Sequence, residues 1–192
     1  IEIEGVDELK PVHYSIIPDR IAAGTFMTIA GITGGDIVIK GCRLEHLDAS
    51  VMKLKEVGLV FEHVQDGIRV LGPHRPKAAN VKTKPYPGFP TDMQAQFMAL
   101  MSIADGTSII KEMIFENRFM HVAELRRMGA DIIVEGGTAT VKGISKLKGA
   151  PLMATDLRAS ASLVVAALAA KGETTIHRLY HLDRGYEKME EK

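Results

Sequence analysis

The sequence predicts an α/β fold made of three copies of one β-α-β-α-β-β unit, of which the third copy is incomplete. In each copy an Asp precedes an apolar stretch of helical periodicity, and a Gly precedes the alternating strand that follows. The matching pairs, 16, 14 and 16 residues apart, are Asp19 and Gly35, Asp92 and Gly106, and Asp156 and Gly172. In the first two copies another Gly follows 23 residues later, and a third 14 residues after that. Spacings this regular indicate that one structural unit repeats.

We expect each copy to open with a strand followed by a buried helix. The opening strands are predicted near His13–Ile17, Ala79–Thr83 and Lys146–Met153. The helices are predicted to begin after Asp19, Asp92 and Asp156, and a left-handed Gly is expected to end each one. The third helix is apolar on all sides over Leu163–Ala170, which predicts burial all round.

The second half of each copy is predicted to hold another helix and a hairpin. Helices are expected near Asp48–Val57 and Asn117–Met128, each followed by two strands joined at Asp66-Gly67 or Gly136-Gly137. The copies then span about residues 12–75, 76–147 and 148–192 of a single domain, 1–192. Because the third copy stops within a predicted helix, Glu187–Lys192, before its hairpin, we expect the chain to be a piece of a longer protein.

Composition limits the classes of function. Hydrophobic residues make up 46% and charged residues 25%, and the 24 basic residues balance the 24 acidic ones. This argues against a nucleic-acid partner bound by bulk charge, and no apolar run reaches the roughly 20 residues of a membrane span. The single cysteine, Cys42, cannot form an internal disulfide, so we expect a cytoplasmic protein. We interpret Cys42 as structural and expect no metal site at His177 and His181.

The acidic residues at the three equivalent helix starts have two interpretations. Asp19, Asp92 and Asp156 fit N-caps, because a carboxylate there accepts hydrogen bonds from free backbone amides. Asp92 fits this interpretation less well, since the restrictive segment Tyr86–Thr91, with two prolines and a glycine, precedes it. That turn is either a shaped connection or the wall of a site.

Four arginines are expected near helix starts: Arg20, Arg118, Arg158 and Arg184. A surface position is the usual interpretation of an Arg, but a cation at a helix N-terminus opposes the helix dipole. Arg118 and Arg184 each follow a turn glycine by 12 residues, so they occupy equivalent positions in two repeats. Because equivalent positions face a common axis, the two side chains could converge on one phosphate or carboxylate. The pattern indicates an anionic ligand.

Four ordered motifs resemble a known enzyme family. They are PTDMQAQF at Pro90–Phe97, FENRFMH at Phe115–His121, ATDLRASA at Ala154–Ala161 and HLDRGYE at His181–Glu187. These strings are similar to those of the UDP-N-acetylglucosamine 1-carboxyvinyltransferases, which are enolpyruvyl transferases. The resemblance covers the whole chain but about half of the family enzyme. It implies an inside-out α/β barrel fold, in which each of two similar domains is a pseudo-threefold array of three β-α-β-α-β-β units.

The resemblance also implies an activity and a set of site residues. The family transfers enolpyruvyl from phosphoenolpyruvate to the 3′-hydroxyl of UDP-N-acetylglucosamine and releases phosphate. This is the first committed step of peptidoglycan synthesis, and fosfomycin inhibits it; no cofactor and no metal are expected. By this resemblance Asp92 takes the proton of the sugar hydroxyl, and Arg118 and Arg184 hold the carboxylate and phosphate of phosphoenolpyruvate. The further matching positions in the cleft are Ile114, Phe115, Asp156, Arg158 and Arg20.

Two family residues have no match in this chain. They are the acid, a cysteine on a mobile loop, to which Cys42 does not correspond, and a lysine that binds phosphoenolpyruvate. We therefore expect half of a site, completed by a second domain, and no turnover by this chain alone. The alternatives that stay open are enolpyruvyl transfer to shikimate 3-phosphate, a non-catalytic anion-binding module, and a structural fragment with no independent role.

Overall fold

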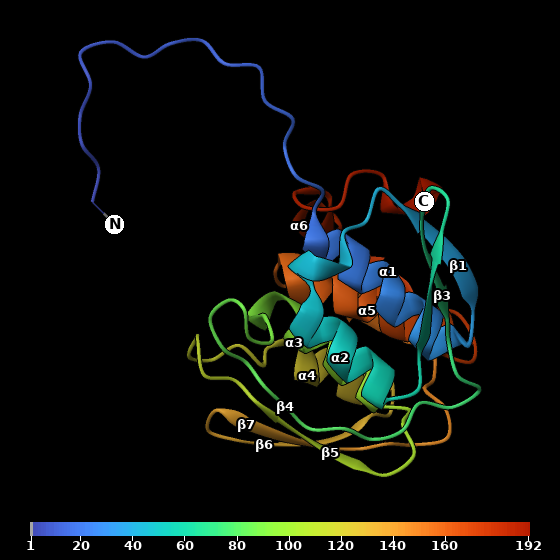
Figure 1. Cartoon of the computed structure of the whole chain (residues 1–192). Coiled ribbons are helices and arrows are strands. Elements are labelled where there is room, and N and C mark those ends of the chain that lie inside the picture. Colours follow the sequence, from blue (N-terminus) through green and yellow to red (C-terminus); the bar gives the residue numbers. More distant parts are fainter. Residues whose placement is uncertain (1) are drawn as a thin grey trace.

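The computed structural model describes residues 2–192. In it, small β-sheets lie around a central group of helices (Figure 1). That group takes one helix from each predicted repeat: α1 (Arg20–Thr33), α3 (Gln94–Met101) and α5 (Leu157–Ala169). The three helices pack against one another, and the contact between α3 and α5 is the most extensive. The predicted α/β class is confirmed, and the sheets lie on the outside of the helices, as in an inside-out barrel.

Each sheet of the described chain belongs to one repeat. The strands are β1 (Asp36–Lys40), β2 (Val60–Val64), β3 (Gly67–Leu71), β4 (Val81–Lys82), β5 (Thr107–Lys111), β6 (Asp131–Glu135), β7 (Thr138–Lys142), β8 (Pro151–Met153) and β9 (Thr175–His177). Their orders are β1-β3-β2, β4-β5-β7-β6 and β8-β9. The opening strands β4 and β8 pair in parallel with β5 and β9, and both are shorter than predicted.

The opening strand predicted at His13–Ile17 is wrong. Residues 2–17 are exposed and extend away from the body of the molecule, without pairing to β1 (Figure 1). An extended segment becomes a strand only where its backbone groups find a partner edge, and this segment finds none in residues 2–192. The second repeat is therefore the complete one, because the described part of the third repeat also has no hairpin after β9.

The two hairpins turn close to the predicted positions. The β6–β7 hairpin turns at Gly136-Gly137, as predicted. The β2–β3 hairpin turns at Gln65-Asp66, one residue earlier than predicted, and Gly67 is the first residue of β3. A Cβ atom at Gly67 would collide with the carbonyl oxygen of Ile39 on β1, so a glycine is required there for close strand contact.

The shorter helices differ from expectation at their ends. Helix α2 (Asp48–Glu56) follows a short 3-10 helix, η1 (Leu44–His46), and is close to its prediction. Helix α4 (His121–Arg127) begins four residues later than predicted, because Asn117 has a left-handed backbone with φ of 54°. After β9 come α6 (Tyr180–Asp183) and the 3-10 helix η3 (Met189–Glu191), which replaces the longer helix predicted at Glu187–Lys192. Lys188, with φ of 45°, interrupts that segment.

The helix caps confirm two of the three aspartate predictions. Asp19 accepts hydrogen bonds from the amides of Ile21 and Ala22 at the start of α1, and Asp156 caps α5 in the same way. Asp92 is not a cap; it lies inside η2 (Thr91–Met93), the 3-10 turn that leads into α3. Gly34 ends α1 in the left-handed conformation, as predicted.

The prediction of a glycine at the end of every central helix is wrong for two of them. The C-cap residue of α3 is Ser102 and that of α5 is Ala170, and neither has a left-handed conformation. Gly106 and Gly172 do have positive φ, but they lie farther on, in the turns that lead to β5 and β9. These glycines therefore aim the chain at the next strand instead of ending the helix.

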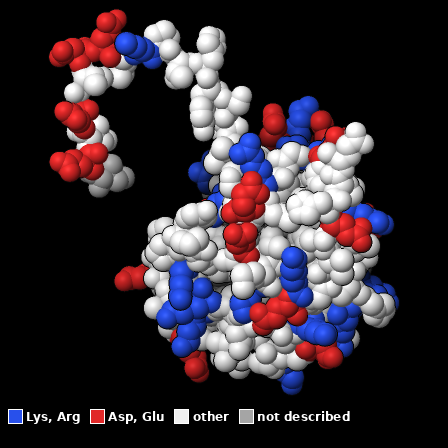
Figure 2. Space-filling view, viewed as in Figure 1, with Lys and Arg blue, Asp and Glu red and all other residues white. Residues whose placement is uncertain are grey.

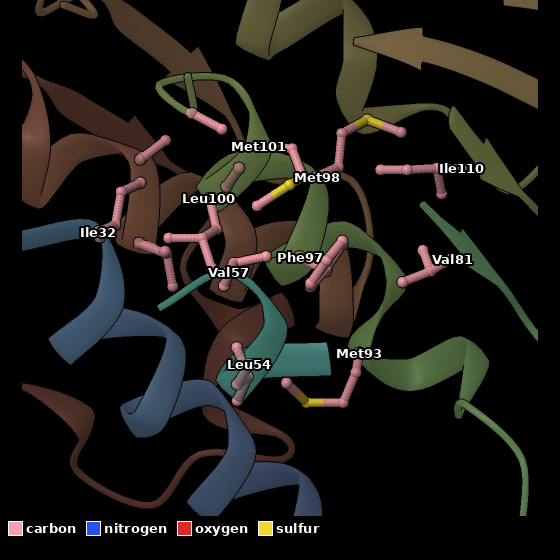
Figure 3. Close-up of a cluster of buried hydrophobic side chains, with 14 of the residues drawn as sticks. Ile32, Leu54, Val57, Val81, Met93, Phe97, Met98, Leu100, Met101 and Ile110 are labelled. Carbon is pink, nitrogen blue, oxygen red and sulfur yellow. The ribbon is translucent and has the colours of Figure 1, made fainter. Parts of the chain in front are cut away.

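The core lies around α3 (Figure 3). Every residue of α3 is buried, and Phe97, Met98, Leu100 and Met101 are at most 1% exposed. All-round burial was predicted for α5 instead, and that prediction is wrong, since Leu168 near its end is 55% exposed. Helix α3 is the enclosed one because it lies between the other two central helices and the second sheet. No helix in residues 2–192 has the length and apolar character needed to cross a bilayer.

Candidate functional site

The candidate site centres on the carboxylate of Asp92, which two arginines hold from different repeats. Arg118 donates from Nη2 to Oδ1 at 2.9 Å, and Nη2 of Arg158 lies 3.3 Å from Oδ2. The Asp92 side chain is 37% exposed, whereas those of Arg118 and Arg158 are 24% and 15% exposed. One acid and two cations at the surface form a group that can exchange protons and bind anions.

Three local structures bring these side chains together. Asp92 is carried by η2, and Arg118 by the turn that precedes α4. Arg158 lies in the first turn of α5, whose free amides, those of Arg158 and Ala159, donate to Asp156 at 2.9 Å each. Asp156 therefore fixes the helix start that presents Arg158, and it makes no bond to Asp92 in the described chain.

A hollow of about 520 Å³ opens beside Arg118. It is lined by residues 112–119 and by Gly136 and Gly137 of the β6–β7 turn. Phe115 is 54% exposed, and its ring lies under the Arg118 guanidinium at 4.9 Å. Ile114 and Phe115, both predicted to face a ligand, thus lie on the wall of a hollow that Arg118 also lines.

The two remaining arginines are not joined to Asp92. Arg184 is exposed and stands at the C-terminal end of α6, not at a helix start as predicted; its Nη2 lies 3.3 Å from Nδ1 of His181. Arg20 donates to the carbonyl of His46 at 3.2 Å and lies over the Tyr86 ring. No hydrogen bond or ion pair within residues 2–192 connects either one to the pair formed with Asp92, so convergence of Arg118 and Arg184 on one anion stays a prediction.

Sequence reasoning missed a buried polar network behind the site. The Tyr186 hydroxyl lies 2.9 Å from Thr25 Oγ1, and Gln96 Nε2 donates to both oxygens, at 3.3 Å and 3.1 Å. The Arg158 guanidinium lies 5.6 Å from the centre of the Tyr186 ring. This network joins α1, α3 and the segment after Arg184. In the sequence it is marked only by a Tyr two residues after the motif arginine, and no periodic pattern predicts what that Tyr contacts.

His121 and Glu112 were also missed. His121 is 1% exposed, and burial lowers its pKa to about 4; Asp156 opposes that shift and Arg118 adds to it. A neutral imidazole adds no cation beside Arg118. Glu112, 6% exposed, accepts hydrogen bonds from both sides of the site. A charged residue directly after the alternating strand Thr107–Lys111 was the signal that could have identified it.

Within residues 2–192, neither Cys42 nor a group of metal-binding side chains forms a second candidate site. Cys42 is half-buried, and burial together with Glu45 raises the pKa of its thiol, which fits the structural interpretation. No three His, Cys, Asp or Glu side chains in the described chain are placed to bind a metal ion. On the face shown in Figure 2, basic and acidic side chains are interspersed over the body of the molecule.

Comparisons with known proteins agree with the four motifs. A model of the EPSP synthase (3-phosphoshikimate 1-carboxyvinyltransferase) family matches residues 1–192. Two curated proteins named UDP-N-acetylglucosamine 1-carboxyvinyltransferase, from Thermodesulfovibrio yellowstonii and Geobacter metallireducens, are 67% and 65% identical over all of this chain. The chain spans 46% of the length of each. The resemblance of the motifs to this group is thereby confirmed.

Solved structures give the same fold. The enolpyruvyl transferase NikO from Streptomyces tendae matches with a TM-score of 0.81 and 27% identity, over 92% of this chain and 42% of that one. EPSP synthase from Acinetobacter baumannii matches with a TM-score of 0.62 and 19% identity, over 85% and 39%, a likeness that shows the fold alone. With a family match along its whole length, the chain belongs to the EPSP synthase family.

Proposed function

We propose that this chain is part of an enzyme that transfers enolpyruvyl from phosphoenolpyruvate to the 3′-hydroxyl of UDP-N-acetylglucosamine and releases phosphate. The observation that carries this proposal is the identity of 65–67% along the whole chain to relatives named for that reaction. The reaction would place the protein in the cytoplasm, at the first committed step of peptidoglycan synthesis and so upstream of cell shape and division.

In this proposal Asp92 takes the proton of the sugar hydroxyl. An ionised carboxylate offers about four acceptor positions; Arg118 donates to one of them, and Arg158 forms an ion pair at the other oxygen. A substrate hydroxyl can therefore bind Asp92 while both arginines keep it in a fixed orientation. Removing the proton makes a weak alcohol nucleophilic, and general-base catalysis of this kind contributes at least ~10²-fold.

The arginines would bind the anionic substrate. Arg118 and Arg184 would hold the carboxylate and phosphate of phosphoenolpyruvate and stabilise charge in the tetrahedral intermediate. Ile114 and Phe115 would contact the nucleotide sugar from the wall of the hollow, while Arg158, Asp156 and Arg20 would line the cleft. This interpretation is supported by the position of Arg118 between Asp92 and the hollow.

The second substrate-binding wall would come from a second domain of the same enzyme. Support comes from the 46% share of the relatives' length that this chain covers. The loop cysteine that fosfomycin modifies would lie in that missing part. The 192-residue chain alone should then release no phosphate from the two substrates, and release by a preparation free of full-length enzyme would contradict a half-site.

One comparison of acceptors tests the proposed function. The full-length enzyme is given phosphoenolpyruvate with UDP-N-acetylglucosamine, with shikimate 3-phosphate, or with neither, and phosphate release is measured. Shikimate 3-phosphate is the second candidate because the matching family model carries the name of that reaction. We expect phosphate release from phosphoenolpyruvate when UDP-N-acetylglucosamine is the acceptor, and none with shikimate 3-phosphate or without an acceptor. Release with shikimate 3-phosphate would keep the reaction and change the acceptor, and no release with either would leave only an anion-binding module.

A further inference from the structure

A buried carboxylate, that of Glu112, lies between the turn that carries Asp92 and the loop that leads to Arg118. Glu112 follows β5 and is 6% exposed. Its Oε1 accepts from Thr83 Oγ1 at 2.8 Å and from the Ile114 amide at 2.8 Å, with the Phe115 amide at 3.3 Å. Its Oε2 accepts from Thr91 Oγ1 at 2.8 Å. All four donors are groups of this chain, so the side chain is engaged with its own neighbours at the inner end of the hollow.

The donors belong to the segments that carry the candidate site. Thr91 precedes Asp92 in η2, so its hydroxyl anchors the turn that presents the acid. The amides of Ile114 and Phe115 belong to the loop that lines the hollow and leads to Arg118. One carboxylate thus ties the Asp92 turn to the Arg118 loop, independently of the ion pair between those two side chains.

The other two repeats do without this carboxylate. The positions equivalent to Glu112 after β1 and β9 are Gly41 and Arg178, and both adopt a left-handed backbone, with φ of 64° and 63°. Glu112 does not, and the chain continues into the loop with a left-handed residue only at Asn117. The turn after this strand can therefore form without an acidic residue. The acidic residue, Glu112, occurs in the repeat that also contains Asp92.

The donors to Glu112 are all neutral. No Lys, Arg or His side chain in residues 2–192 forms an ion pair with it. Burying a carboxylate without a cation costs free energy, which hydrogen bonds to the charged form must offset. The equivalent turns form without such a buried carboxylate. The role of Glu112 is therefore to fix the positions of the two segments that donate to it.

We propose that Glu112 is a positioning residue for the transfer reaction. It holds the Asp92 turn at a fixed distance from the Ile114–Arg118 loop, so that the Asp92 carboxylate and the wall of the hollow can contact the same nucleotide sugar. This inference rests on the proposed function and extends it to a residue that acts through the segments it holds. Displacements of about 1 Å in such a pair can cost about 10²-fold in rate, although the chemistry-bearing side chains remain in place.

The test uses the full-length enzyme with phosphoenolpyruvate and UDP-N-acetylglucosamine. Thr91→Val removes only the hydroxyl that links Glu112 to η2, and Thr91→Ser keeps it. Glu112→Gln replaces one of the two acceptor oxygens by an NH2 group, so the side chain can no longer serve all four donors. Ser108→Ala is the control, because it also removes one hydroxyl: Ser108 lies on β5, is 1% exposed and accepts from the Ala79 amide at 3.2 Å, away from the site.

We expect Thr91→Val to lower kcat about 10- to 100-fold, with Thr91→Ser close to the wild type and Ser108→Ala within about 2-fold. Glu112→Gln should also lower kcat, because the oxygen that remains best serves the three donors on Oε1 and the Thr91 hydroxyl then faces an NH2 group. Circular dichroism and thermal unfolding identify variants that fail to fold. If Glu112→Gln does not fold, the comparison of Thr91→Val with Thr91→Ser tests the proposal without it. A folded Thr91→Val with wild-type kcat, or an equal loss in Ser108→Ala, would overturn the positioning claim while an active wild type keeps the proposed function. A wild-type enzyme inactive with the nucleotide sugar would overturn both.

Discussion

The buried imidazole of His121 makes the stability of this chain dependent on pH. His121 is 1% exposed at the start of α4, and burial lowers its pKa to about 4, with Asp156 opposing the shift and Arg118 adding to it. In the unfolded chain the same group titrates near its ordinary value of about 6.5. Between these two values the unfolded chain is protonated while the folded chain stays neutral.

Protons therefore favour the unfolded state in this range. The free energy of unfolding has its maximal His121 contribution above about pH 6.5, and this contribution falls as the pH drops toward about 4. The gap between the two pKa values corresponds to about 3 kcal/mol at 1.36 kcal/mol per tenfold change in proton affinity. Between about pH 7.5 and about pH 4.5, His121 should remove roughly 2–3 kcal/mol of stability.

Urea unfolding followed by circular dichroism measures this effect directly. The 192-residue chain and its His121→Leu variant are compared at both pH values, and the difference between them cancels carboxylate contributions common to both. The wild type should lose roughly 2–3 kcal/mol more than the variant on acidification. His63→Gln, at an exposed position on β2, is the matched control and should behave as the wild type. An equal loss of stability in His121→Leu and wild type would refute the reasoning.

The remaining predictions concern packing and surface charge. Phe97→Ala empties space at the centre of the core and should lower the free energy of unfolding by roughly 3–5 kcal/mol, measured by calorimetry. Tyr186→Phe removes the hydroxyl shared with Thr25 and Gln96 but keeps the ring; a loss of about 1–3 kcal/mol in urea unfolding is expected, and no change would mean the network contributes nothing. Arg69→Ala breaks exposed ion pairs on the first sheet, and an unchanged urea midpoint is expected; a clear decrease would contradict this.

Local sequence signals predicted much of the fold. The repeat spacing located the central helices, because an Asp lies near the start of each one, and that Asp caps α1 and α5. The hairpin glycines located β2–β3 and β6–β7 to within one residue, since turn chemistry is local. The segment His13–Ile17 could not be placed this way, because a strand requires a partner edge that lies elsewhere in the fold.

The candidate site was predicted as a list of residues but not as an arrangement. Asp92 was expected as a cap or an acid, yet its bond to Arg118 spans 26 residues of sequence, and no local pattern encodes that pairing. The contact between Tyr186 and Thr25 spans 161 residues. Glu112 escaped notice for the same reason, because its donors Thr83 and Thr91 become neighbours only when β4 and η2 pack beside β5.

The central claim is that Asp92, held between Arg118 and Arg158, serves enolpyruvyl transfer to UDP-N-acetylglucosamine. The most direct measurement is phosphate release by the full-length enzyme with both substrates, in the wild type, in Asp92→Asn and in the control Asp105→Asn. Asp105 lies on the same repeat with its side chain 80% exposed. Release that requires the nucleotide sugar, falls at least ~10²-fold in Asp92→Asn and persists in Asp105→Asn is expected. Near-normal release in a folded Asp92→Asn, or release without the nucleotide sugar, would contradict the claim.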